Sequence, residues 1–376
     1  MTTRGALVSV AVMSRVGWGA WIALKLVSGI GNVLGVGLVR ALGSPEAVFA
    51  ARDHELQRIG VRREVRAALH GFARWAEVED QLARLDRAGG RLVTWQDASY
   101  PDLLRHIPDP PLFLYALGEP TERDAFAVAM VGSRDASAYG RQMTAHLGEG
   151  LAARGITIVS GLARGIDAAA HDSALRAGGR TIAVLGSGID VIYPSEHHRL
   201  SMQIARNGAV LSEYPMGAPP DADNFPGRNR LISGVSLGTI VVEAAERSGS
   251  LITARYAAEQ GREVFAVPGP VGARTRGTHQ LLRDGAALVE GPDDVLREIA
   301  PHLRAAARPV APVVAGVEAT VLAELDETPR GVDELMGRTR LSAGALLESL
   351  LLLELRGLVR QLPGQQFARG GAPLGH

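Results

Sequence analysis

The sequence predicts an α/β protein, with a Rossmann-like doubly wound parallel sheet between an N-terminal helical domain and a C-terminal winged-helix-like domain. Three observations favour this architecture. Residues 1–125 carry mostly helical patterns. Residues 126–300 alternate short apolar runs with helical patterns, which is typical of βαβ units. A proline-rich linker, 301–316, then separates residues 317–376, where helical patterns are followed by two short strand-like runs.

Composition narrows the possible classes of protein. The 376 residues are enough for two or three domains, and 46% are apolar, so a sizeable core can form. The 40 basic and 40 acidic residues balance, so any site for a polyanion must be local. The absence of cysteine excludes disulfides, thiol nucleophiles and cysteine-ligated zinc. It also fits a cytoplasmic protein, which is the expected location.

The helical part contains a glycine turn, Gly29-Ile30-Gly31, between two apolar helical patterns. Such a turn resembles a helix-hairpin-helix, which can present backbone N–H groups to a DNA phosphate. A SAM-like packed helical domain with a tight turn explains the same pattern, and we favour that interpretation because one short motif is weak. The apolar run 16–39 is not expected to span a membrane, because Lys25, the only lysine, lies near its centre.

The central part contains seven candidate strands, separated by helical patterns. The clearest helical patterns are Tyr139–Ala153, Ile166–Ala177 and Leu251–Gln260. The candidate strands are Phe126–Val131, Ile156–Val159, Thr181–Leu185, Ala209–Leu211, Thr239–Val242, Val264–Val267 and Ala287–Val289.

The last part of the chain has the order expected of a winged helix. Helical patterns cover Glu318–Leu325, Val332–Met336 and Ser342–Arg356, and the short runs Leu358–Leu362 and Gln366–Ala368 could pair as a wing.

Glycine and small polar residues follow strand after strand in the central part. Ligands of parallel sheets bind outside the carboxyl ends of the strands, where glycine lets backbone N–H groups approach an anion. The segments in question are Gly132-Ser133-Arg134, Ser160-Gly161-Leu-Ala-Arg164-Gly165, Gly186-Ser-Gly188, Ser248-Gly249-Ser250 and Pro268-Gly269. Several such loops on one edge predict an anion-binding groove.

The same loops indicate a nucleic-acid backbone rather than a nucleotide cofactor. A dinucleotide fingerprint is incomplete at residues 186–191, and no Walker lysine motif occurs. Arginines recur instead, at 134, 164, 228 and 230, and Tyr193 and Phe225 could stack on unpaired bases. A single arginine would more often form a surface ion pair, but the set favours phosphate contact.

Catalytic interpretations are weaker. His171 next to Asp172 fits a packed helix with a local hydrogen bond, and the adjacent His197 and His198 do not face one metal ion. Ser160 and Ser250 lack an evident base, and Glu243, which ends a strand, could position loops. We therefore expect no enzyme activity, no metal and no cofactor.

A series of motifs then resembles one known family. In order, the chain contains VGSR, SGLARGIDxxAH, TIAVLGSGIDxxYP, SEYP, FPGRNRLISG, VVEA, SGSLITA, GREVFAVPG and RGTHQLLRDGA. This series is similar to that of the DNA-processing protein A family, also called DprA or Smf, over about residues 126–290. The resemblance implies a protein that binds single-stranded DNA, hands it to the recombinase RecA during natural transformation, and dimerises through its Rossmann-like domain.

The resemblance also implies a set of DNA-binding residues. Arg134 matches the arginine lining the family's DNA pocket, Ser160 to Gly165 match its phosphate-binding turn, and Arg199 is the nearest candidate for a basic residue after YP. Departures from the family pattern are His198, where Asn is common, and His279 in place of the Asn of GTN. The expected DNA-binding set is Gly132, Ser133, Arg134, Ser160, Gly161, Arg164, Gly165, Gly186, Gly188, Arg199, Phe225, Arg228, Asn229, Arg230, Ser248, Gly249 and Ser250.

A nucleotide phosphoribohydrolase is the alternative function, because such enzymes use the same edge loops. Their catalytic loop reads PGGxGTxxE. The corresponding stretch here, Ser233 to Glu243, keeps Gly238-Thr239 and an acid but lacks Pro-Gly-Gly. The sequence therefore favours a non-catalytic DNA-binding protein.

Overall fold

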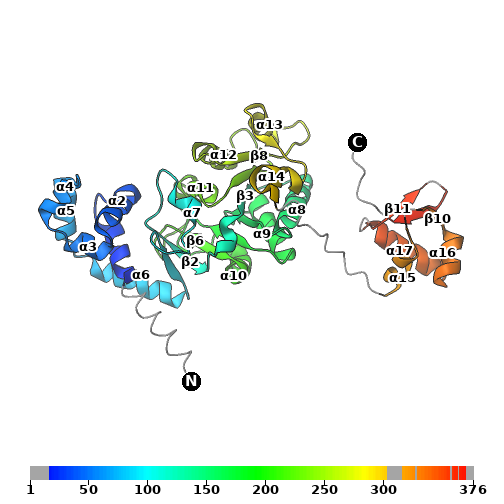
Figure 1. Ribbon diagram of the computed structural model, residues 1–376, viewed down its shortest axis with the longest axis horizontal. Helices are drawn as coiled ribbons and strands as arrows, with labels where there is room; N and C mark the ends of the chain where they lie inside the picture. Colours follow the sequence, from blue (N-terminus) through cyan, green and yellow to red (C-terminus); the bar gives the residue numbers. More distant parts are fainter. Residues whose placement is uncertain (1–16, 303–315, 327, 356–357, 363, 370–376) are drawn as a thin grey trace, which may run out of the picture. The chain divides into compact units, whose positions relative to one another are not determined.

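The computed structural model describes residues 17–302, 316–326, 328–355, 358–362 and 364–369 (Figure 1). The chain divides into two compact units, residues 1–307 and 308–376, which are described separately here. Most of the predicted linker, 301–316, lies outside the described residues.

The larger unit is built on a nine-stranded sheet with the order β1-β2-β6-β5-β4-β3-β7-β8-β9. The seven strands β3 to β9 run parallel and correspond to the seven predicted from the sequence. The strands are β1 Arg91–Thr94, β2 Phe113–Gly118, β3 Ala127–Val131, β4 Thr157–Ser160, β5 Thr181–Val184, β6 Ala209–Ser212, β7 Gly238–Val241, β8 Glu263–Ala266 and β9 Ala287–Leu288. The predicted Rossmann-like parallel sheet is therefore confirmed.

Two strands, β1 and β2, were not predicted. They pair with each other antiparallel, and β2 continues the sheet by pairing antiparallel with β6, with Tyr115 opposite Ser212. The prediction that residues 1–125 are mostly helical is wrong for these two strands, because the sheet begins at Arg91, before residue 126.

Helices cover both faces of the sheet. Alternating strand residues point to opposite faces, so Val128 packs toward one helix layer while Ala127 and Ala129 pack toward the other. The layer on the Val128 face comprises α8 Ala138–Ala152, α9 Ile166–Arg176, α10 His198–Asn207 and α14 Pro292–Ile299. The opposite layer comprises α7 Asp102–Arg105, α11 Asn224–Gly234, α12 Ser250–Glu259 and α13 Arg276–Arg283.

The N-terminal helices pack against the β1–β2 edge of this sheet. A helix over residues 17–26 is followed by α2 Asn32–Leu42, α3 Pro45–Ala50, α4 Asp53–Arg58, α5 Arg63–His70 and α6 Trp75–Arg87. Trp21 and Leu24 share one apolar core with Phe113 and Tyr115 of β2. The predicted turn at Gly29 joins two helices, with Gly29 at a φ of 84°. Among the described residues, none of the helices combines the length and apolarity needed to cross a membrane.

The smaller unit is the predicted winged-helix domain. Its elements are α15 Val317–Ala323, β10 Arg330–Gly331, α16 Val332–Thr339, α17 Ala343–Leu355, β11 Val359–Leu362 and β12 Gln366–Arg369. The strands form an antiparallel sheet with the order β10-β12-β11. Leu346, Leu350 and Leu353 of α17 enter the core, whereas Leu347 and Leu351 are exposed.

Candidate nucleic-acid interface

A groove of about 810 Å³ opens at the carboxyl ends of the central strands. Its walls are the segments that follow β3, β4 and β7, together with Tyr193 after β5 and residues from the segment 220–232 after β6. Because β4 pairs with one side of β3 and β7 with the other, the chain reverses its winding direction at this place. A doubly wound sheet binds its ligands at such a switch point. The groove therefore lies where the sequence predicted the site.

Two exposed arginines, Arg134 after β3 and Arg247 after β7, line the groove. Within the described part of the chain, neither guanidinium makes a hydrogen bond or an ion pair. The Cζ of Arg134 lies 5.3 Å from the centre of the Phe225 ring, a cation–π distance that keeps the guanidinium beside the groove. Both arginines can therefore bind a phosphate without first breaking a hydrogen bond within the protein.

Phe225 and Tyr193 supply aromatic surface at the same place. Their ring centres are 6.0 Å apart, and Tyr193 is 46% exposed. A small hollow of about 60 Å³ adjoins the groove here, and Arg134, Gly161 and Arg164 contribute to its walls together with the two rings. The half-buried Phe225 and the exposed Tyr193, beside the guanidinium of Arg134, suit a base and its phosphate.

Arg228 lines the groove but is buried, with 4% of its surface exposed. Its guanidinium donates to the backbone oxygen of Gly161 at 2.9 Å and to that of Val184. Burial lowers the pKa of Arg228 to about 10, and nearby Asp167 opposes this shift. In the structure Arg228 ties the segments after β4 and β5 to helix α11, and its predicted phosphate contact stays a prediction.

Asp167 is the acidic counterpart of Arg228. Its carboxylate accepts hydrogen bonds from the N–H groups of Gly161, at 3.1 Å, and Ala163, at 3.3 Å. Burial raises the pKa of Asp167, while Arg228 and these hydrogen bonds act in the opposite direction. The carboxylate fixes the turn after β4.

Two other predicted arginines already have partners. Arg164 forms an ion pair with Glu196 at 2.6 Å, although it remains exposed at the small hollow. Arg230 is held by Glu213 at 2.5 Å and by Asp109 at 3.4 Å, and it does not line the groove.

The predicted glycine and serine residues divide into two groups. Gly132, Ser133, Asn229, Ser248, Gly249 and Ser250 line the groove, and Gly161 lines the adjoining hollow. Outside both lie Ser160, Gly165, Gly186, Gly188 and the exposed Arg199. Ser160 is buried and donates to the backbone oxygen of Met130 at 2.6 Å.

Gly165 shapes the site without lining it. Its φ is 78°, and a Cβ at this position would lie 2.2 Å from the backbone oxygen of Ser133. The turn after β4 can therefore press against the segment after β3 only if residue 165 has no side chain.

The candidate catalytic residues are engaged within the protein. Glu243 is buried and its carboxylate accepts the Ser137 N–H at 2.8 Å, at the start of α8. His171 is buried, with Nδ1 2.7 Å from the Thr181 hydroxyl, and burial lowers its pKa to about 3. His197 Nδ1 lies 2.8 Å from the backbone oxygen of Leu162. These contacts agree with the structural interpretations favoured from the sequence.

Sequence reasoning missed Arg247 and Asp167. Arg247 directly precedes the predicted Ser248-Gly249-Ser250 loop, so the rule that selected the loop could have included it. Asp167 stands at the end of the SGLARGID motif, but its hydrogen bonds to the turn could not be read from spacing alone.

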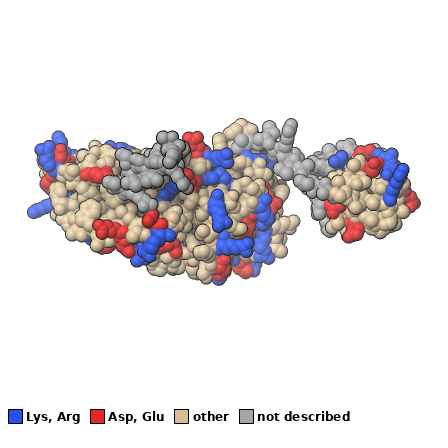
Figure 2. All heavy atoms as spheres, turned by 90° about the horizontal axis from the view of Figure 1, so that it is seen from below, with Lys and Arg blue, Asp and Glu red and all other residues tan. Residues whose placement is uncertain are grey.

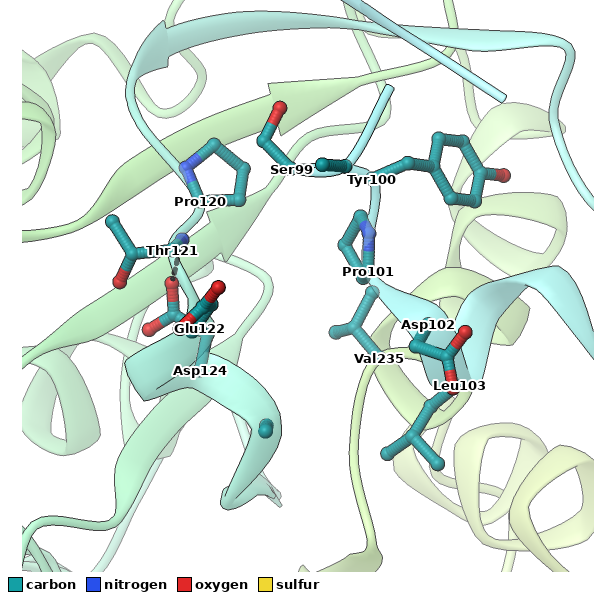
Figure 3. A pocket seen from close by; sticks show the side chains of 12 residues that line it. Ser99, Tyr100, Pro101, Asp102, Leu103, Pro120, Thr121, Glu122, Asp124 and Val235 are labelled. Atoms are coloured by element: carbon teal, nitrogen blue, oxygen red, sulfur yellow. Dashed lines mark hydrogen bonds between the residues drawn. The ribbon is translucent and has the colours of Figure 1, made fainter. Parts of the chain in front are cut away.

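A second cavity, of about 370 Å³, lies at the opposite edge of the sheet (Figure 3). Residues 120–122 and Asp124, just before β3, face Pro101 to Leu103 across it, and Val235, before β7, lies beside Pro101. Asp124, its most enclosed acid, is bound by Arg180 at 2.8 Å. This cavity is remote from the arginine-lined groove and was not predicted.

Comparison with known proteins agrees with this geometry. The family model described as DNA recombination-mediator protein A matches residues 91–300, and the DprA winged helix domain model matches residues 305–365. The chain belongs to the DNA-processing protein A family. The match begins at Arg91, so the family domain includes the two strands that the sequence prediction missed.

Full-length relatives and solved structures show the same relationship. Protein Smf of Synechocystis is 35% identical, and the match covers 93% of this chain and 98% of the relative. Protein Smf of Escherichia coli is 40% identical, and the match covers 82% of this chain and 85% of the relative. The X-ray structure of DNA processing protein A from Streptococcus pneumoniae has a TM-score of 0.58 and 35% identity, covering 74% of this chain and 98% of that one.

One further structure concerns the ligand of a family member. It is titled as showing the single-stranded DNA binding mode of DNA processing protein A from Helicobacter pylori. Its TM-score is 0.50 with 32% identity, and it covers 55% of this chain and 94% of that one.

Proposed function

We propose that this protein is a non-catalytic mediator that binds and protects incoming single-stranded DNA and hands it to the recombinase RecA during natural transformation. The observation that carries the proposal is a pair of exposed arginines, Arg134 and Arg247, that lie in one groove with Phe225 and form no ion pair with any described residue. Guanidinium groups suit phosphates, and a ring suits an unpaired base. The homologue from Helicobacter pylori supports the same ligand.

The groove favours a single strand over a duplex. In a duplex the faces of the bases are stacked on their neighbours, so Phe225 and Tyr193 could not reach them. In a single strand each base has a free face for an aromatic ring. The arginines then contact the backbone, whatever the sequence of the strand.

A non-catalytic role is favoured by how the acidic and imidazole groups are used. The carboxylate of Glu243, which a phosphoribohydrolase would need for chemistry, is buried and accepts the Ser137 N–H. His171 is buried and hydrogen-bonded to Thr181. Together with the incomplete Pro-Gly-Gly loop, these contacts favour binding over hydrolysis.

The partners and location of the protein follow from the family. We propose that it acts in the cytoplasm, as a homodimer through its Rossmann-like domain, with RecA as the protein that receives the DNA. Family membership supports each of these points, and sedimentation of the purified chain would measure the dimer directly.

A fluorescence-anisotropy titration tests the proposal. A labelled single strand and a blunt duplex of the same length and sequence are titrated with the protein over a range of salt concentrations. We expect tighter binding to the single strand, with little dependence on sequence, and a salt slope of about −0.7 for each phosphate neutralised. Equal or tighter binding to the duplex would contradict the proposal.

A further inference from the structure

A second basic surface lies far along the chain from the groove, on the turn between α4 and α5. Arg58, Arg62 and Arg63 are all exposed there. Gly60, with a φ of 84°, makes the turn, and buried Val61, whose N–H donates to the Leu56 oxygen, fixes it to the helical core. We refer to Arg58, Arg62 and Arg63 as the hairpin arginines. Figure 2 shows blue side-chain atoms at the outer end of the N-terminal helices, on the left.

Two acids near the hairpin arginines, Asp53 and Glu55, are paired with other arginines. Asp53 is bound by Arg66 at 2.7 Å. Glu55 is bound by Arg52, its partner in the first turn of α4, at 3.3 Å. Within the described residues, no hydrogen bond or ion pair involves the guanidinium of any hairpin arginine. Glu64 beside them has no ion-pair partner among the described residues, and three arginines against this one acid leave the turn with a net positive charge.

Three unpaired guanidinium groups on one tight turn repel one another, and only solvent screens them. Such an arrangement does not stabilise the fold, since exposed charges of one sign contribute repulsion. It does create a local positive potential, although the whole chain is neutral. Arginine is the side chain best suited to bidentate contacts with phosphate. The chemistry of the turn therefore fits a phosphate backbone.

An aromatic platform lies at the other end of α5. Trp75 is 48% exposed, and its ring packs on Phe72 and Phe49 with centres 5.1 and 5.9 Å apart. The eight residues of α5 span about 12 Å. A basic turn before this helix and an exposed ring after it are the two elements of a surface that binds a single strand, one for the backbone and one for a base.

We propose that the hairpin arginines and Trp75 form a second contact for the single-stranded DNA that the groove binds. The inference rests on the proposed function of the groove. A short oligonucleotide fills the groove alone, whereas a longer strand also contacts the hairpin. The second contact gives a longer footprint and tighter binding of long strands, because linking two sites on one strand makes the second binding step intramolecular.

The test compares two strand lengths in two triple variants of the full chain. The first variant carries Arg58→Gln, Arg62→Gln and Arg63→Gln. The matched control removes the same charge from three other exposed arginines without partners in the described residues, Arg123, Arg206 and Arg283. Poly-dT strands are used, one just long enough for the groove and one several times longer, with thermal melting as a check on folding.

The hairpin variant should bind the short strand like the wild type. Its affinity for the long strand should fall at least about tenfold at low salt, and its salt slope should be shallower by about 2, from three contacts at about 0.7 each. The control should match the wild type with both strands. Unchanged affinity and slope of the hairpin variant with the long strand would overturn the inference. Failure of the wild type to bind even the short strand would instead overturn the proposed function.

Tryptophan fluorescence supplies a second readout. The chain has four tryptophans, at 18, 21, 75 and 95, and among them only Trp75 is exposed. The long strand should quench the emission of the wild type, the short strand should not, and Trp75→Phe should remove the quenching. Equal quenching in wild type and Trp75→Phe would show that Trp75 does not stack on the DNA.

Discussion

Arg134 and Arg228 both approach the Phe225 ring, with Cζ atoms 5.3 and 5.9 Å from its centre, yet they serve different purposes. The guanidinium of Arg228 donates to the backbone oxygens of Gly161 and Val184 and to the side-chain oxygen of Asn229, whereas that of Arg134 donates to no group within the described residues. At the scale of single residues, the free guanidinium can bind DNA and the bonded one supports the wall. The sequence predicts both arginines as basic residues near the edge of the sheet. It does not predict that their roles differ, because Arg228 binds a partner 67 residues away, the backbone oxygen of Gly161.

The buried His171 gives a prediction about pH. Its pKa is lowered to about 3 by burial, so the folded protein holds it neutral while the unfolded chain binds a proton near pH 6.5. The unfolded state therefore binds more protons between about pH 3 and 6.5, and stability falls as pH drops through this window by up to about 1.4 kcal/mol per unit for this group.

Denaturant unfolding at several pH values would measure this effect. The contribution of neutral His171 to the free energy of unfolding is fully present above about pH 6.5. The variant His171→Gln lacks this titrating group, so its free energy of unfolding should fall less steeply as the pH is lowered. Asp167 acts in the opposite direction, because burial raises its pKa, and it is unchanged in both proteins. If the free energy of unfolding falls equally steeply with pH in wild type and variant, His171 can take up a proton in the folded state.

At the scale of elements, the turn after β4 is the part of the site that depends most on backbone conformation. Gly165→Ala should destabilise the protein by more than the about 1–2 kcal/mol of a left-handed alanine, because a ψ of −121° lies outside the left-handed helical region and the added Cβ would meet the Ser133 oxygen. Single-strand binding should weaken as well, since the segment carrying Arg134 must move.

Gly178→Ala is the matched control. Gly178 has a φ of 68° but no atom within 4 Å of an added Cβ, so this variant carries the left-handed cost alone. Thermal melts and strand titrations of both variants give the comparison. Equal destabilisation, with normal binding in both, would show that the close approach at Gly165 is not needed.

The parallel strands β3 to β7 could be predicted because each is a short run buried on both faces, and β8 and β9, which are less buried, could be predicted from their apolar residues. The edge strands β1 and β2 could not. β1 follows the long helix α6 after only a short turn, and β2 finds its partner β6 more than ninety residues later. For the same reason, the position of the groove followed from the carboxyl-edge rule, while the partners of its arginines required the folded chain.

At the scale of the whole molecule, the two units have separate apolar cores, and the winged-helix core shares no residue with the others. From residue 310 to the end, the chain has six arginines and eight acidic residues, which is unfavourable for contact with DNA. Arg330 and Arg338 are, in addition, paired with acids. This unit is therefore not expected to be the main DNA-binding part.

A chain ending near Arg308 should keep most of its affinity for single-stranded DNA. Anisotropy titration beside the full chain is the measurement, with circular dichroism and sedimentation as controls for folding and assembly. The exposed Leu347 and Leu351 suggest that the lost unit contacts another protein instead. Loss of DNA binding in a truncated chain that is still folded and dimeric would make the winged helix a DNA reader.

The most direct test of the whole account concerns the two free arginines of the groove. The double variant Arg134→Ala with Arg247→Ala is compared with Arg123→Ala with Arg206→Ala, which removes equal charge from exposed positions elsewhere. Short poly-dT is titrated over a range of salt concentrations. The account predicts weaker binding by the groove variant, with a salt slope shallower by about 1.4, while the control and both melting temperatures stay unchanged. If the folded groove variant binds with the affinity and the salt slope of the wild type, the result contradicts the account.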